Sequence, residues 1–165
     1  METVFESLQF TSFVQLAIAT GLGLLLGTER TIAGKNAGMR TYALVSLGSC
    51  LLILISVSVS QSFSTVFNFD PLRLAAGIVT GIGFLGAGII IFKNSSLEGL
   101  TTAAGLWVAS AIGISVGYGL YALALFSTVL TLFVFTALWF VETKIKSTAS
   151  SGDTVILDGE EAGRL

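Results

Sequence analysis

The stretch that decides the fold runs from Asp70 to Phe92 and reads DPLRLAAGIVTGIGFLGAGIIIF. From Leu74 to Phe92 it carries no charged side chain, and that length allows a helix to cross a hydrocarbon core about 30 Å thick. Asp70 is a good N-cap, and Pro71 suits the first helical position, where no backbone donor is needed. The stretch therefore predicts a transmembrane helix with a well-defined start.

Glycine is unusually frequent within this stretch. In water such a density would argue against a helix, but in lipid a helix is retained because unpaired backbone groups cost more there. Gly77 and Gly81 form a small-xxx-small pair of the kind that lets helix backbones approach closely. We expect the central helix of a tightly packed bundle, with close contacts at Gly77, Gly81, Gly83, Gly86 and Gly88.

Two short motifs match enzyme signatures by letter but not by context. The run from Gly81 to Gly86 fits G-x-G-x-x-G, which binds dinucleotides only in a turn between a strand and a helix. The run from Gly113 to Gly117 fits G-x-S-x-G, but Ser115 would need an activating base and the chain has no histidine. We therefore expect no catalytic residues, no cofactor and no enzyme activity.

Composition agrees with a membrane protein. The chain has 165 residues, is 53% hydrophobic and only 11% charged, and has a mean hydropathy of +0.90. Soluble domains carry about 25% charged residues. The single cysteine, Cys50, excludes an internal disulfide, and the net charge of -2 gives no reason to expect a nucleic-acid partner.

Charge-free runs on either side of the central stretch predict four further spans. They cover about Phe10 to Gly27, Thr41 to Ser60, a fourth helix beginning at Ser96, and Leu120 to Phe140. The fourth helix is expected to start at Ser96 because Ser95 and Glu98 have capping-box spacing. The run from Gly99 to Val141 is too long for one crossing, so the break should fall at residues 117–119.

Small residues also recur every four positions in two of these spans. The first has a thin face at Ala19, Gly23 and Gly27, and the fourth has a ladder at Gly105, Ala109, Gly113 and Gly117. The predicted fold is an all-α integral membrane protein, a bundle of five transmembrane helices.

The basic residues predict the orientation. Of the eight Lys and Arg residues, all except Arg73 fall on one side of a five-span arrangement. Because loops rich in Lys and Arg stay in the cytoplasm, we expect the N-terminus outside and the C-terminus in the cytoplasm. Residues 1–141 form the transmembrane domain, and residues 142–165 are expected to be a short disordered cytoplasmic tail.

Polar residues at the span boundaries are the candidate functional residues. Buried near the bilayer they are costly unless paired, so we expect a Glu29–Arg40 or a Glu98–Arg30 ion pair. The simpler alternative is that they cap helices and set orientation, and the threonines can bond back to carbonyls one turn earlier. The candidate polar cluster contains Glu29, Arg30, Arg40, Thr41, Asp70, Arg73, Glu98, Thr101 and Thr102.

Several motifs together resemble the MgtC/SapB family. They cover nearly all of residues 10–140 in the right order and spacing, and read GTER (27–30), AGMRT (37–41) with ALV (43–45), DPLR (70–73), GIGFLGAG (81–88) and GLTTAA (99–104) with Trp107. The resemblance implies a bacterial inner-membrane protein tied to growth under magnesium limitation and, in pathogens, to survival inside host cells. Many members carry a cytoplasmic C-terminal domain, for which this sequence has only the tail described above.

The family resemblance leaves two functions open. One is a non-enzymatic regulator of other membrane machinery, with the F-type ATP synthase as a possible partner beside the lipid bilayer and a possible homo-oligomer. The other is a magnesium or other ion transporter that acts as an oligomer. Magnesium prefers carboxylate and carbonyl oxygens in octahedral geometry, and the predicted spans hold no acidic residue away from their ends, which favours the regulator. Direct binding of Mg²⁺ stays open.

Overall fold

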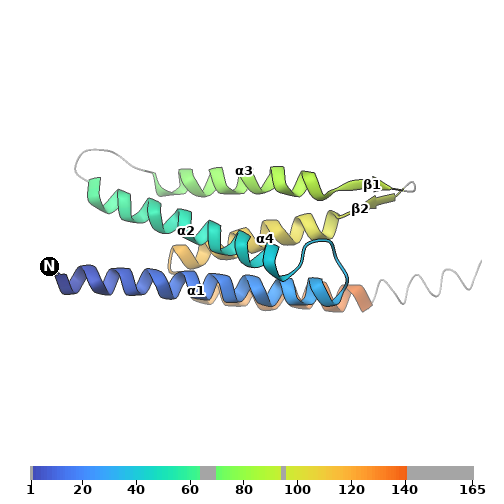
Figure 1. Ribbon diagram of the computed structural model, residues 1–165, viewed down its shortest axis with the longest axis horizontal. Coiled ribbons are helices and arrows are strands. Elements are labelled where there is room, and N and C mark those ends of the chain that lie inside the picture. The colour runs from blue at the N-terminus through green and yellow to red at the C-terminus, as the bar shows by residue number, and fades with distance from the viewer. Residues whose placement is uncertain (1, 64–69, 94–95, 141–165) are drawn as a thin grey trace, which may run out of the picture. The chain divides into compact units, whose positions relative to one another are not determined.

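The protein is built from long helices, as the sequence predicts (Figure 1). A computed structural model describes residues 2–63, 70–93 and 96–140. Within them lie α1 (Glu2–Ile32), α2 (Met39–Phe63), α3 (Pro71–Ile89), β1 (Ile91–Lys93), β2 (Ser96–Glu98), α4 (Leu100–Gly117) and a last helix, Tyr121–Phe140. All five of these helices are long and apolar enough to cross a membrane, which confirms the predicted fold class. Residues 142–165, the predicted tail, lie outside the described part.

The start of α3 follows the predicted chemistry. Asp70 has extended backbone angles (φ -91°, ψ 105°), and its Oδ1 accepts a hydrogen bond from the backbone N–H of Leu72 at 2.9 Å. Pro71 occupies the first helical position. The cap satisfies one of the donors that a helix N-terminus leaves unpaired.

Helix α1 extends further than the predicted first span. It continues through Thr28 to Ile32, so the connection to α2 covers only residues 33–38. The hydroxyls of Thr28 and Thr31 donate to the carbonyls of Leu24 and Gly27, at 2.7 and 2.9 Å, within the helix. Thr31 also accepts from the backbone N–H of Met39 at 3.1 Å and thereby ties the end of α1 to the start of α2.

The predicted start of the fourth helix is wrong. Strands β1 and β2 form an antiparallel hairpin in which Phe92 faces Leu97, and α4 begins only at Leu100. The hydroxyl of Ser96, the predicted first helical residue, donates to the carbonyl of Lys93 at 3.0 Å, while the predicted cap, Ser95, lies outside the described residues. Gly99 precedes α4 with φ +92°, a left-handed conformation that glycine adopts without strain. The predicted break after α4 is confirmed by the turn at residues 118–119, where Gly119 has φ +77°.

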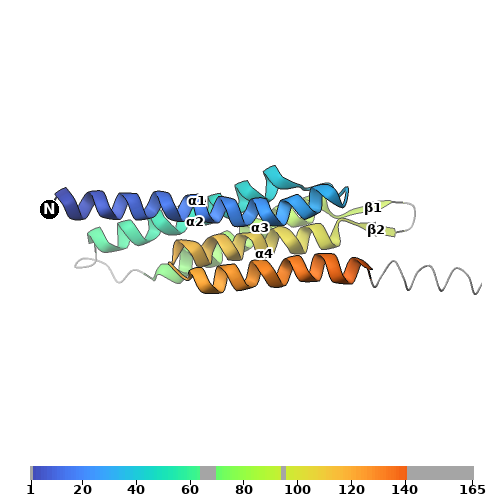
Figure 2. The ribbon, with the colours of Figure 1, turned by 90° about the horizontal axis from the view of Figure 1, so that it is seen from below.

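The closest backbone approaches join α2 to α1 on one side and to α4 on the other (Figures 1 and 2). A Cβ atom added to Gly23 would lie 2.6 Å from the carbonyl oxygen of Tyr42, and one added to Gly117 would lie 2.7 Å from the Cβ of Ile53. Distances this short mean that the backbones touch, so the small residues predicted on the first and fourth spans serve close helix contact. Gly105 and Gly113 are buried in the same helix, α4.

The predicted role of α3 as the tightly packed centre is wrong within this chain. Cβ atoms added at Gly77, Gly81, Gly83 and Gly88 would meet nothing within 4 Å, and one at Gly86 would only touch the Cβ of Ala103 at 3.4 Å. Helix α3 packs mainly against α4, and larger side chains, Ile78 and Ile82, place it against Ile53 of α2. Glycine spacing cannot distinguish a face against protein from a face against lipid, because both faces are apolar.

The chain divides into two compact units, residues 1–131 and 132–165, and the Tyr121–Phe140 helix crosses the division. In the part that belongs to the first unit, Phe126 is exposed, as expected for a face against lipid. All residues of the candidate polar cluster belong to the first unit.

Candidate functional site

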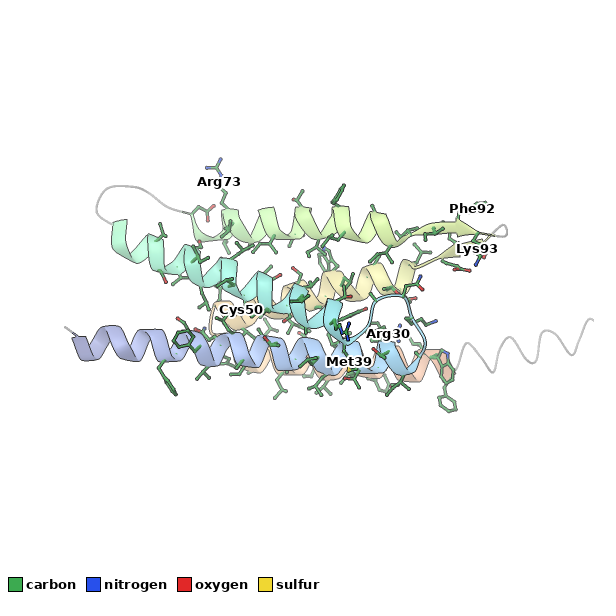
Figure 3. All side chains as sticks on the ribbon, viewed as in Figure 1. Arg30, Met39, Cys50, Arg73, Phe92 and Lys93 are labelled. Carbon is green, nitrogen blue, oxygen red and sulfur yellow. The ribbon has the colours of Figure 1, made fainter. Side chains whose placement is uncertain are left out.

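The candidate polar residues fall at two ends of the helices. The last turn of α1 and the first turns of α2 and α4 meet at one end, which holds Glu29, Arg30, Arg40, Thr41, Glu98, Thr101 and Thr102. Asp70 and Arg73 lie at the start of α3, away from that end, and Figure 3 shows the Arg73 side chain pointing outward there. The sequence prediction placed the two groups on opposite sides in the same way.

Arg30 is the most deeply buried charge of the cluster. Its side chain is 4% exposed, and its Nε donates to Oε2 of the adjacent Glu29, which is 16% exposed. The predicted pairs Glu29–Arg40 and Glu98–Arg30 are wrong, because the ion pair between described residues joins Arg30 to Glu29, and Arg40 and Glu98 are exposed. Because α1 continues past Glu29, both members of the observed pair lie on its last turns and reach each other within the same helix. A buried arginine beside a carboxylate is the arrangement that offsets the desolvation cost of both charges.

Tyr42 continues this polar end into the bundle and is a residue that the sequence reasoning missed. The ring is fully buried, and its hydroxyl donates to the carbonyl oxygen of Thr102 at 3.3 Å, which links α2 to α4. Thr102 is buried and contributes through its backbone, whereas Thr101 is exposed. Aromatic residues are common at span ends, so a tyrosine there is not by itself a sign of function. The one sequence signal for Tyr42 is its position directly after the AGMRT motif.

Further neutral polar groups continue along the α1–α2–α4 interface. The hydroxyls of Ser49 and Ser110 lie 2.9 Å apart, and Nε2 of Gln15 donates to the carbonyl of Val116 at 2.8 Å. Ser46 of α2 is also fully buried, with no hydrogen-bond partner for its hydroxyl among the described residues. We refer to these groups as the buried polar seam: Gln15, Tyr42, Ser46, Ser49, Thr102 and Ser110. The Arg30–Glu29 pair lies at its α1–α2 loop end.

The three acidic residues whose side chains the structure describes are dispersed. Glu29 pairs with Arg30, Asp70 caps α3, and Glu98 lies exposed on β2. Across residues 2–63, 70–93 and 96–140 no three acidic, histidine or cysteine side chains come together as a metal site. Near Asp70, burial raises the pKa of the Tyr118 phenol, with a smaller contribution from the Asp70 carboxylate.

A groove lies between α2 and α3 in the first unit, with a volume of about 720 Å³. Its walls are apolar except at one end, where Arg40 and Thr41 line it, and at Ser49. Three glycines form part of the walls, and each has open space where a Cβ would stand: Gly48, Gly77 and Gly81. The groove is therefore an apolar trough with the exposed cation of Arg40 at one end.

The sequence profile of the MgtC family matches residues 16–144, a range that includes the polar end, the groove and all of the seam except Gln15. The chain belongs to the MgtC family. It is 42% identical over 125 residues to the protein MgtC of Salmonella typhimurium, an alignment that covers 76% of this chain and 51% of the relative.

Two other members of the MgtC family are similarly close. A candidate magnesium transporter of Escherichia coli K12, YhiD, is 44% identical over 123 residues, covering 72% of this chain and 54% of that protein. SapB of Bacillus subtilis is 39% identical over 111 residues, covering 66% and 48%. The chain spans about half the length of the curated relatives that it matches. No solved structure matches the chain significantly.

Proposed function

We propose that this MgtC-family chain is a non-enzymatic regulator that supports adaptation to low magnesium by binding other proteins in the membrane. In this proposal it resides in the bacterial inner membrane, with the Arg30 end in the cytoplasm and the N-terminus outside. The bias of Lys and Arg residues supports that orientation, because basic loops stay in the cytoplasm.

The observation that carries the proposal is the chemistry of the buried polar seam. Its side chains are an amide and hydroxyls, and most of them bond to a neighbouring helix. The Arg30–Glu29 pair at its end adds no net negative charge that would attract a divalent cation. Magnesium keeps several of its waters and is usually held by one or two carboxylates, which the seam lacks, so this interface suits the joining of helices better than the passage of the ion.

Close backbone contact argues in the same direction. At Gly23, Gly27 and Gly117 the neighbouring helix lies so near that even a methyl group would collide with it. A path for a hydrated ion through the α1–α2–α4 interface would require these helices to separate. The polar end remains accessible at Arg40, Thr41, Glu98 and Thr101, which could receive a partner protein.

A transporter is the second candidate, since YhiD is described as a candidate magnesium transporter. An oligomer could build a path between copies that one chain does not contain. The family resemblance supplies the F-type ATP synthase as a candidate partner for the regulator and leaves virulence as a possible context.

Co-purification from native membranes tests the regulator. The full chain, tagged and expressed near its natural level, is cross-linked in cells grown in low magnesium and purified in mild detergent. We expect a stable complex with a membrane protein, ATP synthase first among those examined, and its loss in the double variant Arg40→Gln, Glu98→Gln. The matched control is Lys35→Gln, an exposed charge in the α1–α2 loop. A chain recovered only with itself under these conditions would contradict the proposal.

A further inference from the structure

We propose that the groove between α2 and α3 binds one anionic phospholipid, with its phosphate at Arg40 and Thr41 and an acyl chain along the trough. The argument begins with the location. Both walls are candidate membrane spans, Met39–Ser60 and Leu72–Ile89, so the groove lies where hydrocarbon is the surrounding solvent. An apolar trough there is filled by an apolar occupant.

The dimensions fit a lipid of one leaflet. On α2 the lining residues run from Arg40 to Leu52, a helical rise of about 18 Å. This is close to half of a hydrocarbon core about 30 Å thick, which is the depth of one leaflet. The volume of about 720 Å³ also falls within the range of sites that hold small molecules.

The far end of the groove explains why a membrane-spanning helix fits less well. On α2 the lining ends at Leu52, and the next residue, Ile53, belongs to a buried cluster with Ile78 and Ile82 of α3. A helix that crosses the bilayer would lose its α2 wall there, partway along the Met39–Ser60 span. A lipid chain ends at that depth.

The polar end supplies a phosphate site. Arg40 is exposed and makes no ion pair with any described residue, so its guanidinium is available for bidentate contact with phosphate oxygens. The Thr41 hydroxyl lines the same end. Arg40 and Thr41 also stand in the first turn of α2, where backbone N–H groups favour an anion.

Native mass spectrometry of the purified full chain tests the proposal with three probes. They are palmitoyl-oleoyl phosphatidylglycerol, phosphatidylcholine with the same acyl chains, and soluble glycerol phosphate. We expect one phosphatidylglycerol per chain, weaker binding of phosphatidylcholine and none of glycerol phosphate. Binding of glycerol phosphate alone would assign the end to a free anion and overturn the lipid.

Paired variants locate the site. Arg40→Gln removes the cation and should weaken phosphatidylglycerol binding about tenfold, the loss expected for one charge-assisted contact. Gly81→Leu fills the trough and should also weaken phosphatidylglycerol binding. The controls are Lys35→Gln, a charge outside the lining, and Gly83→Leu, an open position outside the lining. Both controls should bind as the parent does.

Leu44→Trp gives a second way to fill the trough if Gly81→Leu fails to fold, because Leu44 lines it and is 66% exposed. Equal binding by the parent, Arg40→Gln and a folded trough variant would overturn the proposal. A dimer that dissociates when the trough is filled, with lipid binding unchanged, would assign the groove to a second copy and also overturn it.

Discussion

Replacing Gly23 by alanine should destabilise the protein, whereas the same change at Gly21 should not. The added methyl group at Gly23 would lie 2.6 Å from the Tyr42 carbonyl oxygen, 2.9 Å from the Ser46 Cβ and 3.0 Å from the Ala43 Cα. These are backbone or Cβ atoms, which cannot rotate away as the end of a long side chain can. Helix α2 must therefore move.

The magnitude follows from the cost of overpacking. Inserting a methylene group into a well-packed interface costs about 1–3 kcal/mol. Alanine also favours a helix over glycine by about 1 kcal/mol, which offsets part of this cost. At Gly21, on the same helix, nothing lies within 4 Å of the added atom, so only the second effect remains. We expect the two variants to differ by about 1–3 kcal/mol in the free energy of unfolding.

Thermal unfolding in detergent measures this difference, since about 1 kcal/mol shifts the midpoint by 2–4 °C in a chain of this size. The fluorescence of Trp107 and Trp139 and the retention of a monodisperse peak on size exclusion give independent readings. Gly21→Ala is the control for expression and detergent exchange. Equal midpoints for Gly23→Ala and Gly21→Ala would show that the α1–α2 contact is looser than the structure places it.

Three further outcomes follow from the polar residues. Arg30→Gln leaves Glu29 without its cation and should lower stability by about 3 kcal/mol in the same thermal assay, whereas the exposed Lys35→Gln should leave it unchanged. Ser49→Ala should cost only about 0.6 kcal/mol, and the double change with Ser110→Ala should cost no more than either single change, because they share one hydrogen bond; additive losses would contradict that pair. In the double variant Lys35→Cys, Cys50→Ser, the new thiol should react with an impermeant thiol reagent only after the cells are opened. Labelling in intact cells would contradict the proposed orientation.

The sequence was sufficient to predict the helices but not the strands beside them or the contacts between helices. Charge-free runs and the Asp70 cap predict the spans because a membrane helix must satisfy its backbone within itself. The paired strands at residues 91–93 and 96–98 were missed because a capping box and a strand can use the same polar residues. Which glycines touch protein was also not predictable, since Gly23 and Gly83 sit in equally apolar runs and only the tertiary arrangement separates them.

The sequence predicted which end of the bundle holds the candidate site, but it did not predict the side-chain contacts within the site. The motifs placed Arg30 and Arg40 near one boundary, yet burial of one and exposure of the other depends on where α1 stops and α2 begins. Tyr42 was missed because its hydroxyl bonds to a backbone carbonyl distant in sequence. Backbone acceptors leave no sign in the identity of a residue.

Magnesium flux into liposomes tests the central claim, that this chain acts by contact rather than by transport, most directly. The purified full chain is reconstituted at high density with a magnesium-sensitive dye inside, and a known magnesium channel in parallel liposomes shows that the assay detects flux. The proposal predicts dye signals equal to those of protein-free liposomes. Saturable magnesium entry that requires the folded chain, and that is lost in the destabilised Gly23→Ala variant but kept in Gly21→Ala, would contradict it.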